Sequence, residues 1–410
     1  MKKLLLVLLI LSLFINHLNA NEKDLNIIQK DKKEYRLLEK ESIQTRQQSQ
    51  KYDWISPIDL SGNIGRNHSF SDENSRNLNN KNTKSASIGF TQSIYESGGI
   101  GFKMDYADNR FKYEMLSWEN QNSQLIYTIY NTLLDIKKLK LEINQNDYRI
   151  VNKDIELIIK KIQYEAGKTD IIELNNAIMS KNLILKEEIA LKNSLKEKEQ
   201  ELAKYTDLKY DEIEILDFQE TNKDIFLDKN YSILEADAKV EMLNSEYKIK
   251  KSQYLPKLSL SAKASYSNQD EKFNSMISDT NKDDATSSGS LILSMPLYDY
   301  TKSSKVQESK IEVLKQKALV NDLKNETAFE YEQIFTRIDT YLKQNETINK
   351  NIKLYEELIG ANQISSEAGM TSKYDLEILE NTKTINEFDI LINKINILQQ
   401  YAKLYFKIKN

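Results

Sequence analysis

The sequence of 410 residues contains no cysteine, two histidines, three prolines and ten glycines. The absence of cysteine excludes disulfide bonds, thiolate metal sites, cysteine nucleophiles and an acylated N-terminal cysteine. So few glycines and prolines cannot supply the turns of two or three ordinary domains, and long regular elements are therefore predicted. No run of 18 apolar residues follows the N-terminal stretch, so no transmembrane helix is predicted after it.

Patterns typical of catalysis or nucleic-acid binding are equally scarce. The two histidines are His17, in the apolar N-terminal stretch, and His68, in a polar segment. There is no Gly-rich phosphate loop, H-E-x-x-H or G-x-S-x-G pattern, so acid/base chemistry would depend on carboxylates alone. The net charge of −4 does not suggest a nucleic-acid partner. We expect neither an enzyme nor a cofactor or metal site.

Residues 1–20 have the layout of a cleavable secretory signal peptide. Lys2 and Lys3 precede an apolar core from Leu4 to Ile15, and Asn19-Ala20 stand before the polar Asn21. An uncleaved membrane anchor is the alternative, which the shortness of the apolar stretch disfavours. The chain is therefore predicted to be exported.

Period-2 alternation predicts four strands, at about residues 57–66 and 86–95 and again at about 256–267 and 287–298. Polar segments 67–84 and 268–286 are expected to connect each pair as loops. Such strands suit either a soluble sandwich or a membrane sheet with apolar side chains facing lipid. The export signal and the strand length favour the membrane sheet. Because four strands leave open edges, other copies must complete a barrel, with eight strands from two chains or twelve from three.

Each strand pair is followed by a long helical pattern without proline. In the first copy it covers about 62 residues, or roughly 90 Å at about 1.5 Å per residue. A generic coiled coil would explain this periodicity equally well, so the helices alone indicate only packing on other helices.

The long helices end in related turns, EAGKTDIIEL (165–174) and EAGMTSKYDLEIL (367–379). Their spacing from the preceding strands is also conserved between the copies, which indicates an internal duplication. We divide the chain into the signal peptide, a first repeat (21–206), a connecting segment (207–227) and a second repeat (228–410), with tip turns at 166–172 and 368–374. Each turn holds a helix-ending glycine, an N-cap and an acidic residue in equivalent places: Gly167, Asp170 and Glu173 in the first, and Gly369, Ser372 and Asp375 in the second.

The order of these pieces resembles the outer membrane efflux protein family typified by TolC. The resemblance covers essentially the whole mature chain, and its most specific motifs are L-P-x-L-x-L at 255–260, P-L-Y-D at 296–299 and G-x-x-S-x-x-D-L at 369–376. The sequence departs from the family pattern at Ser93, which stands where the second copy has Pro296, and in lacking a second counterpart of Gly98. The family's second acidic tip position falls on Asn176 and Ile378, which puts a doubled carboxylate ring in doubt.

The resemblance implies a mainly α fold with a membrane β-barrel portion. Four strands per chain would contribute to a trimeric twelve-stranded barrel in outer-membrane lipid, and long α-helical hairpins would form a periplasmic tunnel. It further implies a homotrimer that docks with a periplasmic adaptor and an inner-membrane pump, located in the cell outer membrane with a large periplasmic portion. The hairpin tips would form the closable periplasmic end, narrowed at Asp375.

Two functional hypotheses follow. The first is the outer-membrane channel component of a tripartite efflux or type I secretion system, a passive conduit from periplasm to exterior. The second is an exported trimeric coiled-coil structural or adhesin protein of the envelope, which would not need two-faced strands. Glu173 and Asp375 could together place six carboxylates around the trimer axis. Alternatively, each could merely favour the N-terminus of its own helix.

Overall fold

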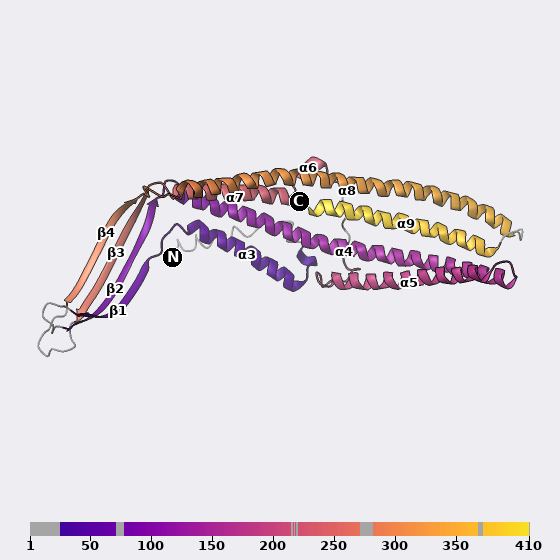
Figure 1. The fold of residues 1–410 in the computed structure, drawn as a ribbon, viewed down its shortest axis with the longest axis horizontal. Helices are drawn as coiled ribbons and strands as arrows, with labels where there is room; N and C mark the ends of the chain where they lie inside the picture. Colours follow the sequence, from indigo (N-terminus) through magenta and orange to yellow (C-terminus); the bar gives the residue numbers. More distant parts are fainter. Residues whose placement is uncertain are drawn as a thin grey trace, which may run out of the picture. The chain divides into compact units, whose positions relative to one another are not determined.

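The computed structural model describes residues 25–70, 78–214, 216, 218, 220–270, 282–367 and 372–409. Its elements follow the order of Figure 1: η2 (Leu25–Ile27), α3 (Lys30–Tyr52), β1 (Asp59–Phe70), β2 (Leu78–Tyr95), α4 (Gly99–Glu165), α5 (Ile171–Leu202), α6 (Lys223–Asp228), α7 (Tyr231–Ser252), β3 (Lys257–Asp270), β4 (Lys282–Ser294), α8 (Lys302–Glu367) and α9 (Lys373–Phe406). The series α3–β1–β2–α4–α5 recurs as α7–β3–β4–α8–α9. The prediction of a mainly helical, internally repeated chain with four strands is confirmed.

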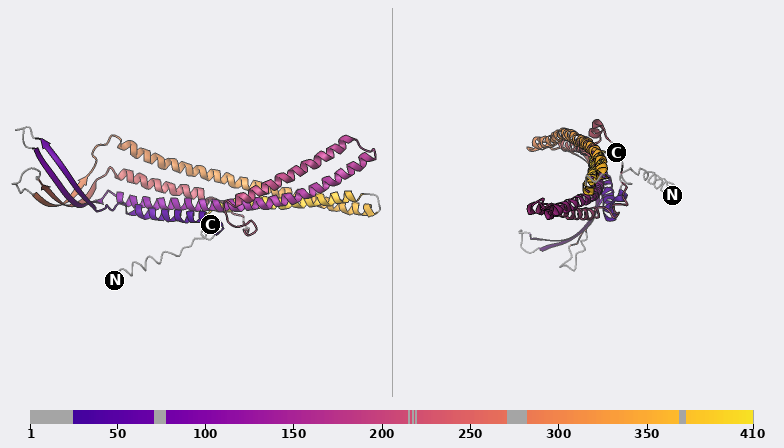
Figure 2. Two further views of the ribbon diagram at one scale, coloured as in Figure 1. Left: turned by 90° about the horizontal axis from the view of Figure 1, so that it is seen from below. Right: turned by 90° about the vertical axis from the view of Figure 1, so that its right-hand side faces the viewer.

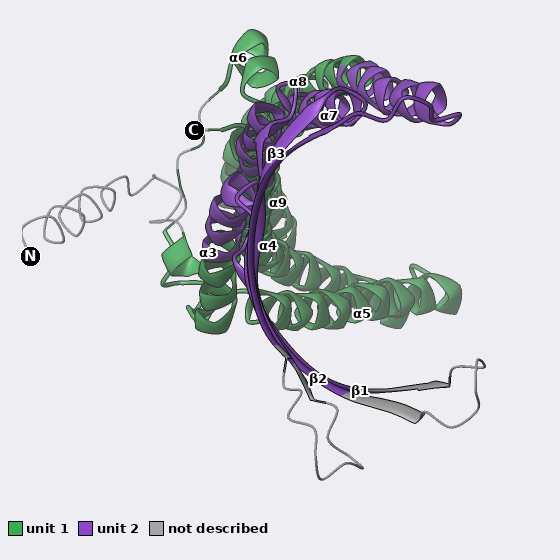
Figure 3. Cartoon of the chain, turned by 90° about the vertical axis from the view of Figure 1, so that its left-hand side faces the viewer, with its two compact units in different colours: residues 1–40, 116–235, 321–410 green, residues 41–115, 236–320 purple. Residues whose placement is uncertain are grey.

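The chain forms two compact units that cut across the sequence repeats. Unit 1 comprises residues 1–40, 116–235 and 321–410, and unit 2 comprises residues 41–115 and 236–320 (Figure 3). Each unit contains segments of both repeats, because helices of different repeats pack on each other. In unit 1 the Gln145 amide donates to Asp389 Oδ1 at 2.7 Å, and in unit 2 the Asn109 amide donates to Ser245 Oγ at 2.9 Å.

The long helices exceed their expected length: α4 has 67 residues and α8 has 66. Each begins with a different device. Before α4, Gly98 adopts a left-handed φ of 87°, which glycine tolerates at little cost. Before α8, Asp299 Oδ1 accepts the backbone N–H of Thr301 at 2.8 Å and its hydroxyl at 2.7 Å. An aspartate-centred turn therefore takes the place of the missing second glycine.

The strands also differ from their expected bounds, since β2 begins at Leu78 and β3 continues to Asp270. Much of the polar sequence expected as loops belongs to strands, with Asn79 paired to Ser69 and Asn82 to Arg66. Backbone ladders do not require apolar side chains, so the scarcity of aliphatic residues was a poor guide to the strand ends. At the other end β4 stops at Ser294, before Pro296, which has no N–H to donate. Residues 71–77 and 271–281 lie outside the described part.

The four strands form one antiparallel sheet in the order β1-β2-β3-β4. Apolar residues share one face across the strands, as in the pairs Leu60↔Ile88 and Leu260↔Leu291. This apolar face is open: Leu60 is 79% exposed. The opposite face carries serine and threonine, whose hydroxyls bond in cross-strand pairs such as Ser265 with Thr286 at 2.7 Å. The predicted two-faced character of the strands is confirmed.

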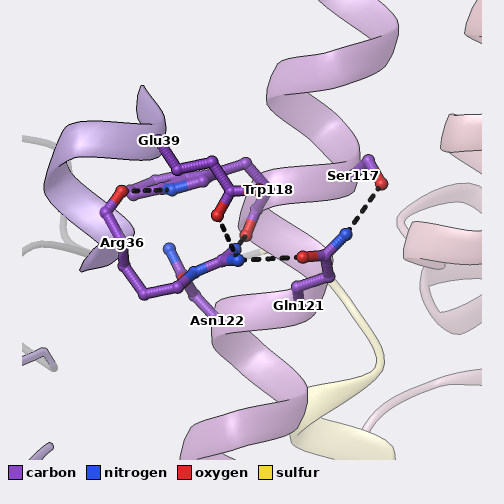
Figure 4. A network of polar contacts seen from close by, with 6 residues as sticks. All are labelled: Arg36, Glu39, Ser117, Trp118, Gln121 and Asn122. Carbon is purple, nitrogen blue, oxygen red and sulfur yellow. Dashed lines mark hydrogen bonds and ion pairs between the residues drawn. The ribbon is translucent and has the colours of Figure 1, made fainter. Parts of the chain in front are cut away.

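In unit 1 a buried arginine fixes the entry helix α3 against α4 (Figure 4). Arg36 Nε donates to Asn122 Oδ1 at 2.6 Å and Nη2 donates to the Trp118 carbonyl at 2.9 Å. The Trp118 indole N–H donates in return to the Arg36 carbonyl at 2.8 Å. Arg36 and Trp118 are only 8% and 3% exposed. A buried guanidinium is tolerated here because its N–H groups find acceptors, including the Glu39 carboxylate at 2.5 Å.

The connecting segment contains a short helix that periodicity did not predict. Helix α6 has six residues, which is too short for a recognisable 3.6-residue pattern. Its Phe226 is fully buried in a cluster of unit 1 that also contains Ile334, Ile338, Leu404 and Ile408. The segment is therefore anchored to α8 and α9 by apolar packing. Throughout the described ranges no helix is both long and apolar enough to cross a membrane.

Candidate functional site

The first hairpin turn, between α4 and α5, is closed by a glycine. Gly167 has a φ of 70°, a conformation that costs other residues about 1–2 kcal/mol. Its N–H donates to the Tyr164 carbonyl at 2.9 Å, while the Lys168 N–H donates to the Gln163 carbonyl at 2.8 Å. These two bonds define a Schellman motif and satisfy carbonyls at the end of α4. No atom lies within 4 Å of where a Cβ would stand, so the backbone conformation alone requires glycine.

Asp170 begins the returning helix α5 as its N-cap. Its backbone is extended, with φ −94° and ψ 172°, and its carboxylate accepts the Glu173 N–H at 2.9 Å. Such a cap satisfies one of the free N–H groups of the first helical turn, and its loss typically costs about 1 kcal/mol. The structure thus brings Gly167, Asp170 and Glu173 together in one turn.

The Glu173 carboxylate is tied back to α4. It forms an ion pair with Lys160 and accepts a hydrogen bond from the Thr169 hydroxyl at 3.1 Å. The hydrogen bond from Lys160, with that from Thr169, lowers the pKa of Glu173 below its usual value. The negative charge of Glu173 is therefore balanced within its own hairpin. We call Lys160, Thr169 and Glu173 the tip clasp.

The second hairpin turn lacks this clasp in its described part. Ser372 is the N-cap of α9 and accepts the Tyr374 N–H at 3.2 Å. Asp375 stands in the first turn of α9 with an exposed side chain, and forms no ion pair with any described residue. Gly369 lies outside the described residues. The two acidic tip residues, equivalent in sequence, differ in their partners.

Sequence reasoning found the caps of these turns but missed Lys160 and Thr169. A signal was available for the lysine. Lys160 and Glu173 stand on opposite arms of the hairpin at nearly equal distances from Gly167, and residues so placed face each other when two helices return antiparallel.

Below the tips, α4 lies between α5 and α9 (Figure 2). It joins α5 through the Arg149–Glu187 pair at 3.4 Å, and α9 through Asn152, whose side-chain oxygen accepts from the Asn381 amide at 2.8 Å. Helix α9 in turn meets α8, where the Asn393 amide donates to Asn345 at 2.9 Å. The lateral order within unit 1 is therefore α5–α4–α9–α8, with α5 and α8 at the edges.

Both edge helices expose large apolar side chains. On α5, Leu183 is 66% exposed and Ile189 is 61% exposed, and on α8, Leu354 is 56% exposed and Ile364 is 72% exposed. Two helices with unpartnered apolar positions can pack on each other. Among the described residues, no group of three or more His, Cys, Asp and Glu side chains could hold a metal ion.

Comparison with known proteins agrees with this architecture. Residues 224–403 match the family model described as "Outer membrane efflux protein". A search of curated proteins finds no match.

Solved outer-membrane channels share the fold over nearly the whole chain. The CmeC outer membrane channel of Campylobacter jejuni superposes with a TM-score of 0.69 at 13% identity, covering 93% of this chain and 86% of that one. The outer membrane protein VceC of Vibrio cholerae gives 0.71 at 13% identity, covering 93% and 94%. The open-state MtrE outer membrane channel of Neisseria gonorrhoeae gives 0.65 at 11% identity, covering 91% and 85%.

The family match and the shared fold support a location in the cell outer membrane with a large periplasmic part. The family model and the compared structures describe outer-membrane efflux proteins and channels. Residues 224–403 thus match the model of the outer membrane efflux protein family, and the described chain has the fold of solved outer-membrane channels such as CmeC and VceC.

Proposed function

We propose that this chain is the outer-membrane component of a tripartite efflux or type I secretion system, acting as a passive homotrimeric conduit from the periplasm to the exterior. The observation that carries the proposal is the two-faced sheet. One face exposes Leu60, Ile64 and Leu293 at 79%, 83% and 73%, and the other carries hydroxyl groups. Exposed apolar residues on this scale suit lipid, while hydroxyls suit a wet lumen.

The open edges of the sheet favour a trimer. Strands β1 and β4 each pair on one side only among the described strands. Unpaired backbone N–H and C=O groups cost several kcal/mol each in hydrocarbon, so the sheet must close with other copies. Three copies supply twelve strands, enough for an aqueous interior, whereas eight strands are just filled by their own side chains. In the same trimer, the apolar edge of α5 would pack against that of α8 from the next protomer.

The conduit depends on partners for energy. The sequence has no phosphate-binding loop, so nucleotide-driven transport has no site in this chain. An inner-membrane pump would supply the energy, and a periplasmic adaptor would join it to the helical end.

The hairpin tips are the proposed periplasmic gate, formed by Gly167, Asp170 and Glu173 with Gly369, Ser372 and Asp375. The glycines and N-caps shape the turns, and the acidic residues set the charge of the opening. Because Glu173 pairs with Lys160, Asp170 and Asp375 are the gate carboxylates that have no ion pair with a described residue in this proposal. Three copies of each around one axis would attract cations.

The alternative of a structural or adhesin coiled coil receives less support. Such a protein needs export and long helices, but nothing in it requires a sheet with an exposed apolar face. The shared fold extends through the strands, since the compared channels cover at least 91% of this chain.

Because the chain lacks cysteine, introduced thiols can test the proposal. We expect the purified protein to sediment as a trimer in detergent and to conduct ions in planar bilayers. A charged thiol reagent should lower the conductance of Ser61→Cys, on the polar face, and leave that of Leu60→Cys, its neighbour on the apolar face, unchanged. A monomer that retains its strands, or equal effects at both positions, would contradict the proposal.

A further inference from the structure

A cleft lies on the polar face of the sheet where a glycine interrupts the side chains. The strand register places Asp59 of β1 and Lys263 of β3 on either side of Gly89 of β2. The cleft has a volume of about 430 Å³. It is lined by all three residues and by serine and threonine, and Pro57, Phe90 and Ala262 also contribute to its lining. A Cβ on Gly89 would stand 3.0 Å from the Ala262 carbonyl oxygen, so the tight strand contact itself favours glycine there.

Hydroxyl groups border the cleft in bonded pairs. The hydroxyl oxygens of Ser61 and Ser87 lie 2.8 Å apart, and those of Thr91 and Ser261 lie 3.1 Å apart. Hydroxyls that already bond to each other still have acceptor capacity for a ligand. The walls can therefore accept hydrogen bonds from a bound molecule without losing their own partners.

On β1, β2 and β3, Asp59 and Lys263 are the charged residues of this face around the cleft. Over the polar-face positions within residues 59–63, 85–93 and 259–267, all the others are serine, threonine, asparagine or glycine. Neither charge forms an ion pair with another residue that the structure describes, and both side chains are exposed. One negative and one positive group therefore stand on opposite sides of a hydroxyl-lined depression.

We propose that this cleft binds small zwitterions, with the ligand's ammonium group toward Asp59 and its carboxylate toward Lys263. The proposal depends on the function above only in placing the polar face in the lumen. Adjacent strands lie about 4.8 Å apart, so the two backbone positions are separated by about 10 Å. A flexible molecule with charges at its two ends can span the remaining gap, whereas a simple anion or cation can satisfy only one group.

The affinity should be low. Exposed charge pairs contribute little because water and salt screen them. Binding in the millimolar range suits a conduit, because a solute that passes through must also leave. The site would thus select weakly among passing solutes.

The test uses 6-aminohexanoate as the zwitterion and hexanoate as the matched carboxylate without an ammonium group. Saturation-transfer NMR on the detergent-solubilised full chain should detect 6-aminohexanoate at low ionic strength, with hexanoate at least threefold weaker. Asp59→Asn and Lys263→Gln should each weaken 6-aminohexanoate binding at least threefold. The control variant Lys257→Gln removes a positive charge from the same face at the first residue of β3. It should bind 6-aminohexanoate as well as the parent protein does.

Equal binding of hexanoate, unchanged binding in both cleft variants, or no detectable zwitterion would overturn the proposal. Bilayer conductance of the same preparation tests the channel function separately. A protein that conducts ions but does not bind 6-aminohexanoate would refute only the proposal that the cleft binds zwitterions. Binding by a protein that does not conduct would refute the channel and leave the cleft intact.

Discussion

The hairpin that joins α4 to α5 and the hairpin that joins α8 to α9 begin their second helix on the same plan. In each, an N-cap accepts a backbone N–H, from Glu173 to Asp170 at 2.9 Å and from Tyr374 to Ser372 at 3.2 Å. Each then places an acidic residue in the first helical turn, where the helix dipole favours negative charge. The two hairpins differ in the next contact: among the described residues, only Glu173 pairs with a lysine from the opposite arm of its hairpin.

This difference shows that duplicated positions need not keep duplicated roles. The two acids occupy equivalent places after their glycines and both are exposed, yet Glu173 pairs with Lys160 whereas Asp375 has no ion pair with a described residue. Equivalence in sequence preserved the local helix start, which depends on residues within one turn. The long-range partner depends on the opposite helix, and there the repeats diverged.

The two tips should differ most in the effect of removing Asp375. Changing Asp375 to Ala should leave the trimer intact and weaken block of the channel by a trivalent lanthanide ion about tenfold, because each chain loses one carboxylate that no described lysine or arginine balances. Glu173→Ala should weaken the block less than twofold, because its charge is already balanced by Lys160. Planar-bilayer recordings over a range of lanthanide concentrations measure both effects.

The matched control is Asp375→Glu, which keeps the charge and should keep the block. Equal losses of lanthanide block in Asp375→Ala and Glu173→Ala would instead support a ring of six carboxylates, two from each chain. If lanthanide block is unchanged in both single variants and in the double variant, the two acids act only at the ends of their own helices. The gate would then be formed by other residues.

A second prediction concerns the turn itself. Gly167→Ala should destabilise the first hairpin end by about 1 kcal/mol, because alanine disfavours a φ of 70°. Hydrogen exchange of the tip amides should quicken roughly fivefold.

Gly360 is a suitable control, since it lies inside α8 without a positive φ and with no atom within 4 Å of the place where a Cβ would stand. Gly360→Ala should slow local exchange, because alanine is the better helix former. Slower exchange in Gly167→Ala as well would show that the left-handed turn is not required.

Much of the fold could be predicted because its signals are local. Alternating residues such as Leu258, Ser259 and Leu260 identify both faces of the sheet, and Gly167 with Asp170 identifies a helical turn. The strand ends could not be predicted in this way. Asn79 to Asn82 extend β2 through backbone pairing, which leaves no apolar pattern in the sequence.

The parts of the sites that were missed depend on tertiary register. Asp59, Gly89 and Lys263 come from three strands of two repeats, and only the pairing of β2 with β3 brings the last of them beside the others. Helix α6 forms because Phe226 packs into the cluster with Ile334 and Leu404, not because its six residues have strong periodicity. Single-sequence patterns do not contain these relations.

The smallest expected effect comes from removing the lysine partner of Glu173, so that both hairpin tips carry an unpaired acidic residue. Lys160→Ala removes the partner of Glu173, so the freed carboxylate should join Asp375 and strengthen lanthanide block two- to threefold at neutral pH.

The pKa of Glu173 is below its usual value in the folded chain, so the clasp is fully present above the usual glutamate pKa. It should be lost only as the pH falls through the lowered value. The hydrogen-exchange protection of the tip amides in the parent protein should therefore not change between neutral pH and about pH 5, once the pH dependence of the intrinsic exchange rate is taken into account.

The control for Lys160→Ala is the double variant Lys160→Ala/Glu173→Ala. Its lanthanide block should return to that of the parent protein, because the freed charge is removed again. Stronger block that persists in this double variant would show that Lys160 acts by its own positive charge and that the clasp has no part in the difference between the tips.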